Sequence, residues 1–232
     1  MENIVSQKTL AIIGVIAAIV IGAVVVASTY VLGGGDIGLA ASSPDFATAE
    51  ALYHQGRPEA ALIHYEKALG QNPGNPEILN GMGISYLAMG RYDDAIVHLE
   101  EAYVAEPDDL VITYNLAVSL AEAGWYLDAH DILDRGLAID PTNYMLLEYK
   151  SLLYTGNGEH EVALPYYDRA LAVQESHFLM LGKAYSLFQL DQDRAAYTYI
   201  DRVLAADPSN ELAIYMREAA GFEMLLEGLL AD

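Results

Sequence analysis

The chain has 232 residues and a formal net charge of −22, from 33 acidic against 11 basic side chains. Hydrophobic residues make up 53% and charged residues 19%, which argues against a disordered chain and allows a sizeable buried core. The acidic surface repels nucleic-acid phosphates, and the absence of cysteine excludes disulfides, thiolate metal sites and cysteine nucleophiles. We therefore expect no nucleic-acid partner. The acidic charge serves either the solubility of the protein alone or a preference for basic partners.

The first element in chain order is an apolar segment near the N-terminus. After a short flank, residues 1–8, no charged side chain occurs from Thr9 to Leu32. As a helix this segment would span about 36 Å, against roughly 30 Å of bilayer hydrocarbon. A cleaved signal peptide, the alternative, has a shorter apolar run of about 7–15 residues that ends at a cleavage site. We predict an uncleaved transmembrane anchor over residues 9–32.

The charges on either side of this segment predict its orientation, and its own sequence allows a second interpretation. Lys8 precedes the span and the next basic residue is Arg57, which by the positive-inside rule predicts a cytoplasmic N-terminus and a domain outside the cell membrane. Residues 33–41 begin with three glycines and predict a flexible linker. Residues 12–23 also resemble the apolar helix of type IV pilins, although the processing glycine and early glutamate of pilins are missing.

Prolines mark a repeat in the rest of the chain. Pro73, Pro107 and Pro141 are 34 residues apart, and Pro208 follows 67 residues later, two periods less one. Each ends an amphipathic helical pattern, because proline restricts the residue before it and lacks an N–H group. The period predicts five units between residues 42 and 210, followed by a capping helix over 211–232; the units are 42–75, 76–109, 110–143, 144–176 and 177–210.

Small residues recur at fixed places in these units, where two helices must approach closely. One series is Ala49, Gly83, Ala117, Ser151 and Ala184; a second is Ala61, Ala95, Ala129, Ala163 and Ala196; a third is Ala68, Ala102, Gly136, Ala170 and Val203. Glycines that favour the end of a helix close the first helix of four units, at Gly56, Gly90, Gly124 and Gly158.

This pattern resembles the tetratricopeptide-repeat (TPR) family. The second unit comes close to the family signature, with Leu79, Met82, Gly83, Tyr86, Ala95, Leu99, Ala102 and Pro107. The fourth and fifth units depart from it, because Lys150 and Lys183 occupy a usually apolar position and Glu175 replaces the proline, so we expect these units to pack less regularly. The resemblance implies an all-α fold: a right-handed α-solenoid of five TPR helix pairs plus a C-terminal capping helix, preceded by one transmembrane helix.

In TPR proteins the first helix of each unit lines a concave face. The resemblance therefore implies a peptide-binding groove lined by Asn80, Ile84, Tyr114, Asn115, Val118, Tyr149, Leu152, Phe178, Leu181 and Tyr185. Glu50 and Glu148 would add carboxylates, and no lysine or arginine of the kind that clamps chaperone C-termini is expected there. Such a face suits a protein or peptide partner with apolar and basic groups. Packing of these side chains between helices is the alternative.

No motif of an enzyme or a cofactor site occurs. HExxH, GxSxG, GxxxxGK[ST] and paired cysteines are all missing, so we expect no enzyme activity, no cofactor and no metal. Two His–acid pairs lie one helical turn apart, His98 with Glu101 and His130 with Asp134. Two ligands do not make a metal site, and we interpret them as solvated helix-surface residues.

The sequence as a whole predicts a membrane-anchored scaffold for protein–protein interaction. The alternative is a structural subunit that assembles with itself, as a filament or a complex, through its repeats and its apolar N-terminal helix. In the last helix Phe222, Leu225, Leu226 and Leu229 follow helical spacing, and Met224 and Leu230 fall off that stripe and widen the apolar arc. This arc predicts either self-association or a second partner, with a simple cap as the other interpretation.

Overall fold

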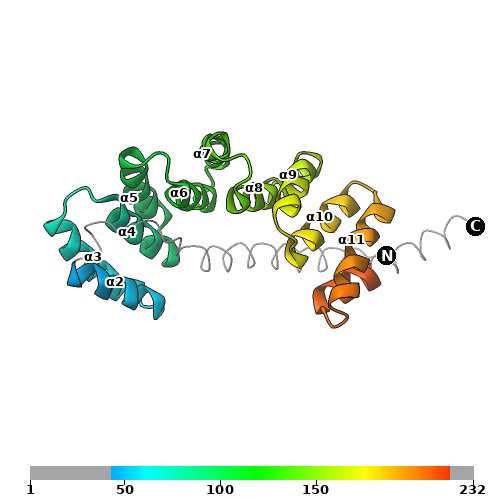
Figure 1. Cartoon of the computed structure of the whole chain (residues 1–232), viewed down its shortest axis with the longest axis horizontal. Helices are drawn as coiled ribbons and strands as arrows, with labels where there is room; N and C mark the ends of the chain where they lie inside the picture. Colours follow the sequence, from blue (N-terminus) through cyan, green and yellow to red (C-terminus); the bar gives the residue numbers. More distant parts are fainter. Residues whose placement is uncertain (1–42, 220–232) are drawn as a thin grey trace, which may run out of the picture. The chain divides into compact units, whose positions relative to one another are not determined.

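The structure is a computed structural model that describes residues 43–219, and every regular element in that range is an α-helix (Figure 1). The helices are α2 (Pro44–His54), α3 (Pro58–Gln71), α4 (Pro76–Ala88), α5 (Tyr92–Ala105), α6 (Leu110–Glu122), α7 (Tyr126–Ile139), α8 (Tyr144–Gly156), α9 (His160–Val173), α10 (His177–Gln189) and α11 (Asp193–Ala206). Residues 211–219 are also helical. The predicted all-α class is therefore confirmed for the described part of the chain.

Several predictions fall on residues at the two ends. The flank 1–8, the transmembrane segment 9–32 and the linker 33–41 lie outside the described residues, as does the end of the predicted cap, 220–232. Between residues 43 and 219, no helix is both long enough and apolar enough to cross a membrane. The predicted anchor and the apolar arc of the last helix stay predictions.

The described residues divide into two compact units, and each is treated by itself. The N-terminal unit, 43–141, contains the pairs α2–α3, α4–α5 and α6–α7; the C-terminal unit, 142–219, contains α8–α9 and α10–α11. The first helices α4, α6, α8 and α10 all have 13 residues, and every second helix has 14. Lys150 and Lys183 therefore leave the helix lengths of the fourth and fifth pairs unchanged.

Small residues allow the helices of each pair to lie close together. Ala61, Ala95, Ala129, Ala163 and Ala196 are all fully buried, as the repeat pattern predicts. The closest approach is at Gly83, where a Cβ atom would lie 2.4 Å from Cγ of Leu99. Because interiors are close-packed, even an alanine at this position would force the Leu99 side chain or the two helices to shift.

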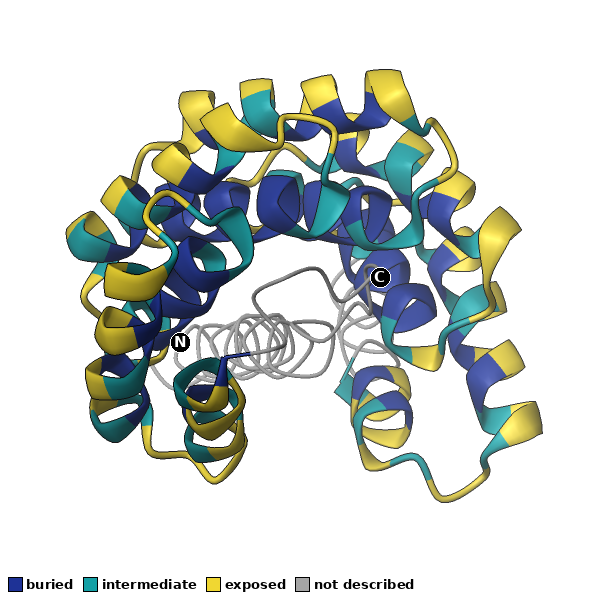
Figure 2. Ribbon diagram, turned by 60° about the vertical axis from the view of Figure 1, so that its left-hand side comes forward, coloured by how far each residue is buried: buried dark blue, intermediate teal, exposed yellow. Residues whose placement is uncertain are grey.

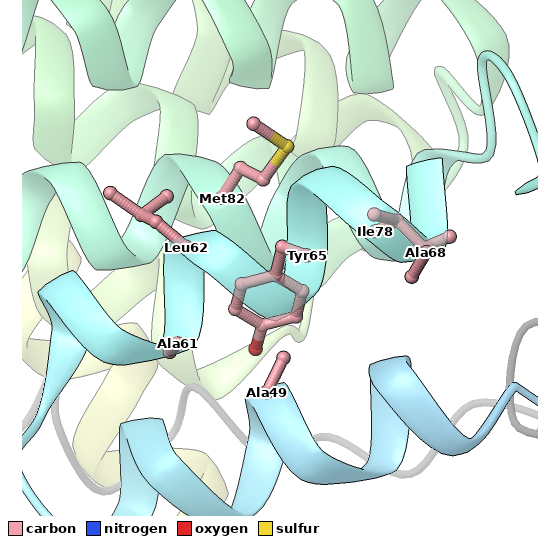
Figure 3. Packing of buried hydrophobic residues seen from close by; sticks show 7 residues of the cluster. All are labelled: Ala49, Ala61, Leu62, Tyr65, Ala68, Ile78 and Met82. Carbon is pink, nitrogen blue, oxygen red and sulfur yellow. The ribbon is translucent and has the colours of Figure 1, made fainter. Parts of the chain in front are cut away.

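A tyrosine on a second helix packs against a glycine on the following first helix in both units. In the N-terminal unit, Tyr65 lies in a buried cluster with Ala49, Ala61, Leu62, Ala68, Ile78 and Met82 (Figure 3). A Cβ atom on Gly81 would lie 2.5 Å from the Tyr65 ring. In the C-terminal unit, a Cβ atom on Gly182 would lie 2.7 Å from Oη of Tyr167. The missing side chain of each glycine makes room for a ring that fills the space between pairs.

The turn inside each pair has the same backbone geometry. Gly56, Gly90, Gly124 and Gly158 have φ between +70° and +87°, the left-handed region that glycine enters without strain. Asp191 takes the equivalent place in the fifth pair with φ +57°, and it is the one non-glycine residue of the described range with positive φ. The glycines predicted to end first helices are confirmed in this role.

Four first helices, α4, α6, α8 and α10, begin at a side-chain cap that was not singled out from the sequence. Asn75, Asp109 and Asn143 follow the repeat prolines by two residues, and each accepts a hydrogen bond from a backbone N–H of the first turn. Ser176 does the same without a preceding proline. Such caps satisfy N–H groups that have no partner within the helix, so the prolines and caps together set where each unit starts.

From the second pair onward, first helices are more deeply buried than second helices; in the first pair, α2 buries only Ala49 whereas α3 buries four residues. In α6, ten of the 13 residues are buried, whereas α7 buries four of 14. Figure 2 shows the exposed residues gathered along the second helices. The first helices α4, α6, α8 and α10 therefore form an inner layer in their units, and the second helices that follow them form the solvent-facing layer.

Candidate peptide-binding face

All ten residues predicted to line a peptide-binding groove lie on first helices. In the N-terminal unit, Asn80 and Ile84 are on α4, and Tyr114, Asn115 and Val118 are on α6. In the C-terminal unit, Tyr149 and Leu152 are on α8, and Phe178, Leu181 and Tyr185 are on α10. The helices α4 and α6 contact each other, as do α8 and α10. The structure therefore gathers each group of five on two adjacent inner-layer helices, and we call these the first-helix faces of the two units.

Most of these side chains are less accessible than a contact residue would be. Asn80 and Phe178 are half-buried, and the other eight are buried, with Tyr114 only 1% exposed. In the N-terminal unit the reason is packing on several sides, because α6 contacts α4, α5 and α7. Asn80 and Phe178 are thus the two predicted residues that present side-chain surface on the faces.

The two asparagines of the N-terminal face bind each other. The amide Nδ2 of Asn115 donates a hydrogen bond to Oδ1 of Asn80 at 2.8 Å, which links α6 to α4. From the sequence both asparagines were expected to line the peptide-binding groove. Asn115 is instead 1% exposed, and its side-chain amide donates a hydrogen bond within the fold. Asn80 is therefore the half-buried amide that remains at the surface of this face.

Glu148 is the most unusual side chain of the C-terminal face. It lies on α8, at the repeat position held by Asn80 in α4 and Tyr114 in α6, and it is only 3% exposed. Its Oε1 accepts a hydrogen bond from the Tyr144 hydroxyl at 3.0 Å, while Oε2 has no hydrogen-bond partner among the described residues. Burial raises the pKa of this carboxyl from 4.5 to about 7, and the Tyr144 bond opposes the shift. Sequence reasoning placed Glu148 on the inner face but missed its burial.

A buried network of hydroxyl groups lies beneath the same unit. Thr155 Oγ1 is 3.0 Å from both the Tyr167 hydroxyl and Ser186 Oγ, and all three side chains are buried. His160 Nδ1 lies 3.4 Å from Ser186 Oγ. Burial raises the pKa of the Tyr167 phenol, and burial also lowers the pKa of His160. Since Ser186 is fully buried and already hydrogen-bonded, this serine–histidine contact is a structural link and offers a substrate no nucleophile.

Comparison with known proteins assigns the helix pairs to a family. Tetratricopeptide-repeat sequence profiles match residues 52–102, 86–147 and 150–211, which together cover well over half of the chain. The chain belongs to the tetratricopeptide-repeat family. No curated protein matches it.

Solved TPR structures share the fold at low sequence identity. The MamA protein of Desulfovibrio magneticus RS-1, solved from residue 41 to its end, superposes with a TM-score of 0.66 at 19% identity, over 75% of this chain and 99% of that solved chain. TTC0263, a thermophilic TPR protein of Thermus thermophilus, gives 0.58 at 22% identity over 75% and 96%. YrrB, described as a TPR protein with an unusual peptide-binding site, gives 0.61 at 18% identity over 75% and 91%. At these identities the likeness establishes the fold alone.

The two lysines at the usually apolar TPR position point away from the faces. The ammonium of Lys183, on α10, donates hydrogen bonds to Asp168 on α9 and, at 2.7 Å, to the Tyr199 hydroxyl on α11. Lys150, on α8, is fully buried and its Nζ lies 5.0 Å from the centre of the Tyr166 ring on α9. Both cations are engaged with second helices, so neither lysine serves as a clamp for an acidic ligand.

Two histidines that were interpreted from the sequence as solvated helix-surface residues are more buried than expected. His98 and His130 are half-buried rather than solvated. The His98 ring stacks on Tyr86 with a centroid distance of 5.3 Å and an interplanar angle of 5°. Within residues 43–219, no three His, Cys, Asp or Glu side chains come together as a metal site would require. His98 thus packs as an aromatic ring between the two helices of its pair.

Proposed function

We propose that this protein is a non-enzymatic scaffold, tethered to a membrane by residues 9–32, that binds a protein or peptide segment on the first-helix faces of its repeats. The tether is proposed from the uncharged run Thr9–Leu32, and the exposure of the repeats outside the cytoplasm is proposed from Lys8. The TPR fold supports the interaction role, because stacked helix pairs offer extended surfaces built from many units.

The observation that carries the proposal is the contrast between two sets of repeat positions. One position between the helices of a pair keeps alanine in all five units, from Ala61 to Ala196. The position on the first-helix faces changes chemistry from unit to unit, as Asn80, Tyr114, Glu148 and Leu181. Variation on one layer of an otherwise regular repeat supports a surface adapted to a particular partner.

The charge of the faces supports a partner with basic and apolar groups. The half-buried carboxylate of Glu50 lies on the first helix α2, while Lys150 and Lys183 are engaged on the opposite side of their helices. Tyr53 and Phe178 add half-buried aromatic surface. Aromatic rings give large contact area, and carboxylates with few competing cations favour lysine or arginine on the incoming segment.

A matched pair of substitutions tests the binding site. Phe178→Glu places a charge on the C-terminal face, whereas Val162→Glu places the same charge on α9, where Val162 is 43% exposed. The full chain is used as bait on native membranes, and captured proteins are compared between variants. We expect the partner to be lost with Phe178→Glu and retained with Val162→Glu. Equal capture by both variants would place the binding site elsewhere.

The tether and the oligomeric state have tests of their own. Alkaline carbonate extraction should leave the full chain in the membrane pellet, and protease added from outside should digest the repeats. Release into the soluble fraction rejects the anchor, and full protection of the repeats rejects the orientation. Light scattering over a concentration series should give a single mass. Growth of the mass with concentration would favour the alternative of a self-assembling subunit.

A further inference from the structure

Three consecutive large apolar side chains are exposed at the turn between α6 and α7. Trp125 is 51% exposed, Tyr126 46% and Leu127 85%. Trp125 is also the sole tryptophan of the chain. Single exposed apolar residues are common on soluble proteins, but a run of three is unusual and marks a surface that contacts something else. We call these three residues the Trp125 cluster.

The fold itself does not require apolar residues at this turn. The other four pairs carry polar or charged residues at the place of Trp125, namely Arg57, Arg91, Glu159 and Gln192. At the place of Leu127 they carry Glu59, Asp93, Glu161 and Arg194. The backbone is the same in spite of this, because Trp125 N donates to Leu120 O at 2.8 Å as Arg91 N donates to Tyr86 O at 2.9 Å. The Trp125 cluster is therefore a feature of one pair, and the shared turn geometry does not explain it.

The charges around the cluster indicate what would cover it. Glu122 and Asp128, which flank it in the chain, are both exposed. Arg135 is the only lysine or arginine between residues 110 and 141, and it pairs with Asp131 at 2.6 Å. A second copy of the chain would bring the same acidic flanks and a net charge of −22, and an anionic lipid surface would be repelled as well. A basic segment meets no such repulsion.

We propose that the Trp125 cluster is a second binding surface, which takes a protein segment carrying apolar side chains flanked by lysine or arginine. Tryptophan and tyrosine are the residues most often responsible for binding energy at interfaces, since they bury much area with little loss of rotamer freedom. The apolar side chains of the segment cover Trp125 and Leu127, and its cations lie near Glu122 and Asp128. This surface is on the turn of the third pair, so it is separate from the first-helix faces.

The single tryptophan provides a direct test on the full chain. The probe is a synthetic amphipathic helical peptide of leucine and lysine, and its counterpart has glutamate in place of lysine. When tryptophan alone is excited, the lysine peptide should shift the emission to shorter wavelength and protect it from acrylamide quenching. The glutamate peptide should do neither. An absence of protection by the lysine peptide, or equal protection by both peptides, overturns the proposal.

Two variants show whether binding depends on the cluster. The double variant W125R/L127D reproduces the Arg-Tyr-Asp turn of the second pair, residues 91–93, and leaves the net charge unchanged. The control Val104→Asn removes an apolar residue that is 80% exposed on α5. Measured by anisotropy of labelled lysine peptide, the double variant should bind at least about tenfold more weakly, while the control matches the wild type. Equal binding by all three chains, or equal loss in both variants, overturns the proposal.

The other possible occupants give distinct results. An emission shift on raising the protein concentration alone would assign the cluster to a second copy of the chain. A shift caused by phosphatidylcholine vesicles, with or without phosphatidylglycerol, would assign it to a lipid surface. Either result overturns the proposed protein segment. Circular dichroism checks that W125R/L127D is folded, and if it is not, acrylamide protection of the wild type decides alone.

Discussion

The N-terminal and C-terminal units build the same helix pairs around different buried chemistry. At the repeat position where α4 and α6 carry Met82 and Leu116, α10 carries Lys183, whose side chain is 8% exposed. The ammonium lies 4.6 Å from the centre of the Tyr199 ring and donates to Asp168. A ring and a carboxylate can replace the water that a buried cation loses. This repeat position therefore requires a long side chain of suitable volume, but it does not require an apolar one.

The buried tyrosines differ between the units in a similar way. Tyr65 in the N-terminal unit donates its hydroxyl hydrogen to Glu50, which is half-buried and reaches water. Tyr167 in the C-terminal unit is fully buried, and its hydroxyl lies in the buried network of Thr155 and Ser186. Both rings sit against a glycine of the next first helix, at Gly81 and Gly182. The packing is the same in the two units while the polar surroundings are not.

The largest expected effect concerns the close approach of α4 and α5 at Gly83 in the N-terminal unit. Gly83→Leu places a side chain where a Cβ atom already lies 2.4 Å from Leu99, so α4 and α5 must separate. We expect a loss of about 3 kcal/mol in the free energy of unfolding, at the upper end of overpacking. The matched change in the C-terminal unit, Ala184→Gly, should cost only about 1 kcal/mol of helix propensity. Urea unfolding of both variants checks this, and equal losses would contradict it.

The next effect concerns pH and the buried carboxyl of the C-terminal unit. The folded pKa of Glu148 is about 7 against 4.5 ordinarily, so the folded state holds its proton more tightly than the unfolded state. The contribution of Glu148 to the free energy of unfolding is therefore greatest at low pH, falls as the pH rises above 4.5, and is lowest above about pH 7. We expect Glu148→Gln to be more stable than the wild type near pH 8 by about 2–3 kcal/mol, and similar to it near pH 4.

This pH dependence is measured as a difference between two chains. The other acidic groups also titrate, but they are common to the wild type and Glu148→Gln, so their contribution cancels in the difference. Urea unfolding at several pH values gives the two curves. A difference that stays constant with pH would mean that Glu148 is solvated in the folded protein.

A smaller effect separates the two buried tyrosines. Tyr167→Phe removes a hydroxyl from a fully buried network, which should cost about 1–2 kcal/mol. Tyr65→Phe removes a hydroxyl from the half-buried Glu50, which can bind water instead, so the cost should be about 0.5–1 kcal/mol. Thermal or urea unfolding ranks the two variants. A larger loss with Tyr65→Phe than with Tyr167→Phe would show that the hydroxyl network of the C-terminal unit contributes less to stability than the Tyr65–Glu50 hydrogen bond.

The smallest effect on stability is expected for a substitution that gives the C-terminal unit the residue that the N-terminal unit carries at the same repeat position. Lys183→Met gives α10 the residue that α4 carries at Met82, with similar length and no charge to desolvate. Since an ion pair between a buried ammonium and an exposed carboxylate is worth little relative to a well-packed apolar side chain, the free energy of unfolding should change by less than about 1 kcal/mol. Asp168→Asn, which leaves the buried ammonium in place without its carboxylate, should destabilise more. A large loss with Lys183→Met would show that the ion pair is essential to this unit.

Some features of the site were predictable and others were not, as particular residues show. The sequence placed Asn80 and Asn115 on first helices because helical periodicity is local and visible within one unit. It did not show that the two amides bind each other, since the partners are 35 residues apart and meet only when α4 and α6 stack. Glu148 was expected on a face open to ligand, yet the folded chain covers it to 3% exposure.

The sequence by itself determined the repeat: the period of the prolines, the alanines that let helices touch, and the glycines that end first helices. These are properties of short stretches, in which a residue's conformational preference or size acts on its immediate neighbours. Only the tertiary structure decided which polar groups lose water and what replaces it. Within residues 43–219, Lys183 finds Asp168 and Tyr199, Glu148 keeps one unpaired oxygen, and the Trp125 cluster stays uncovered. Burial depends on how successive pairs stack, and that stacking brings together residues that no local pattern connects.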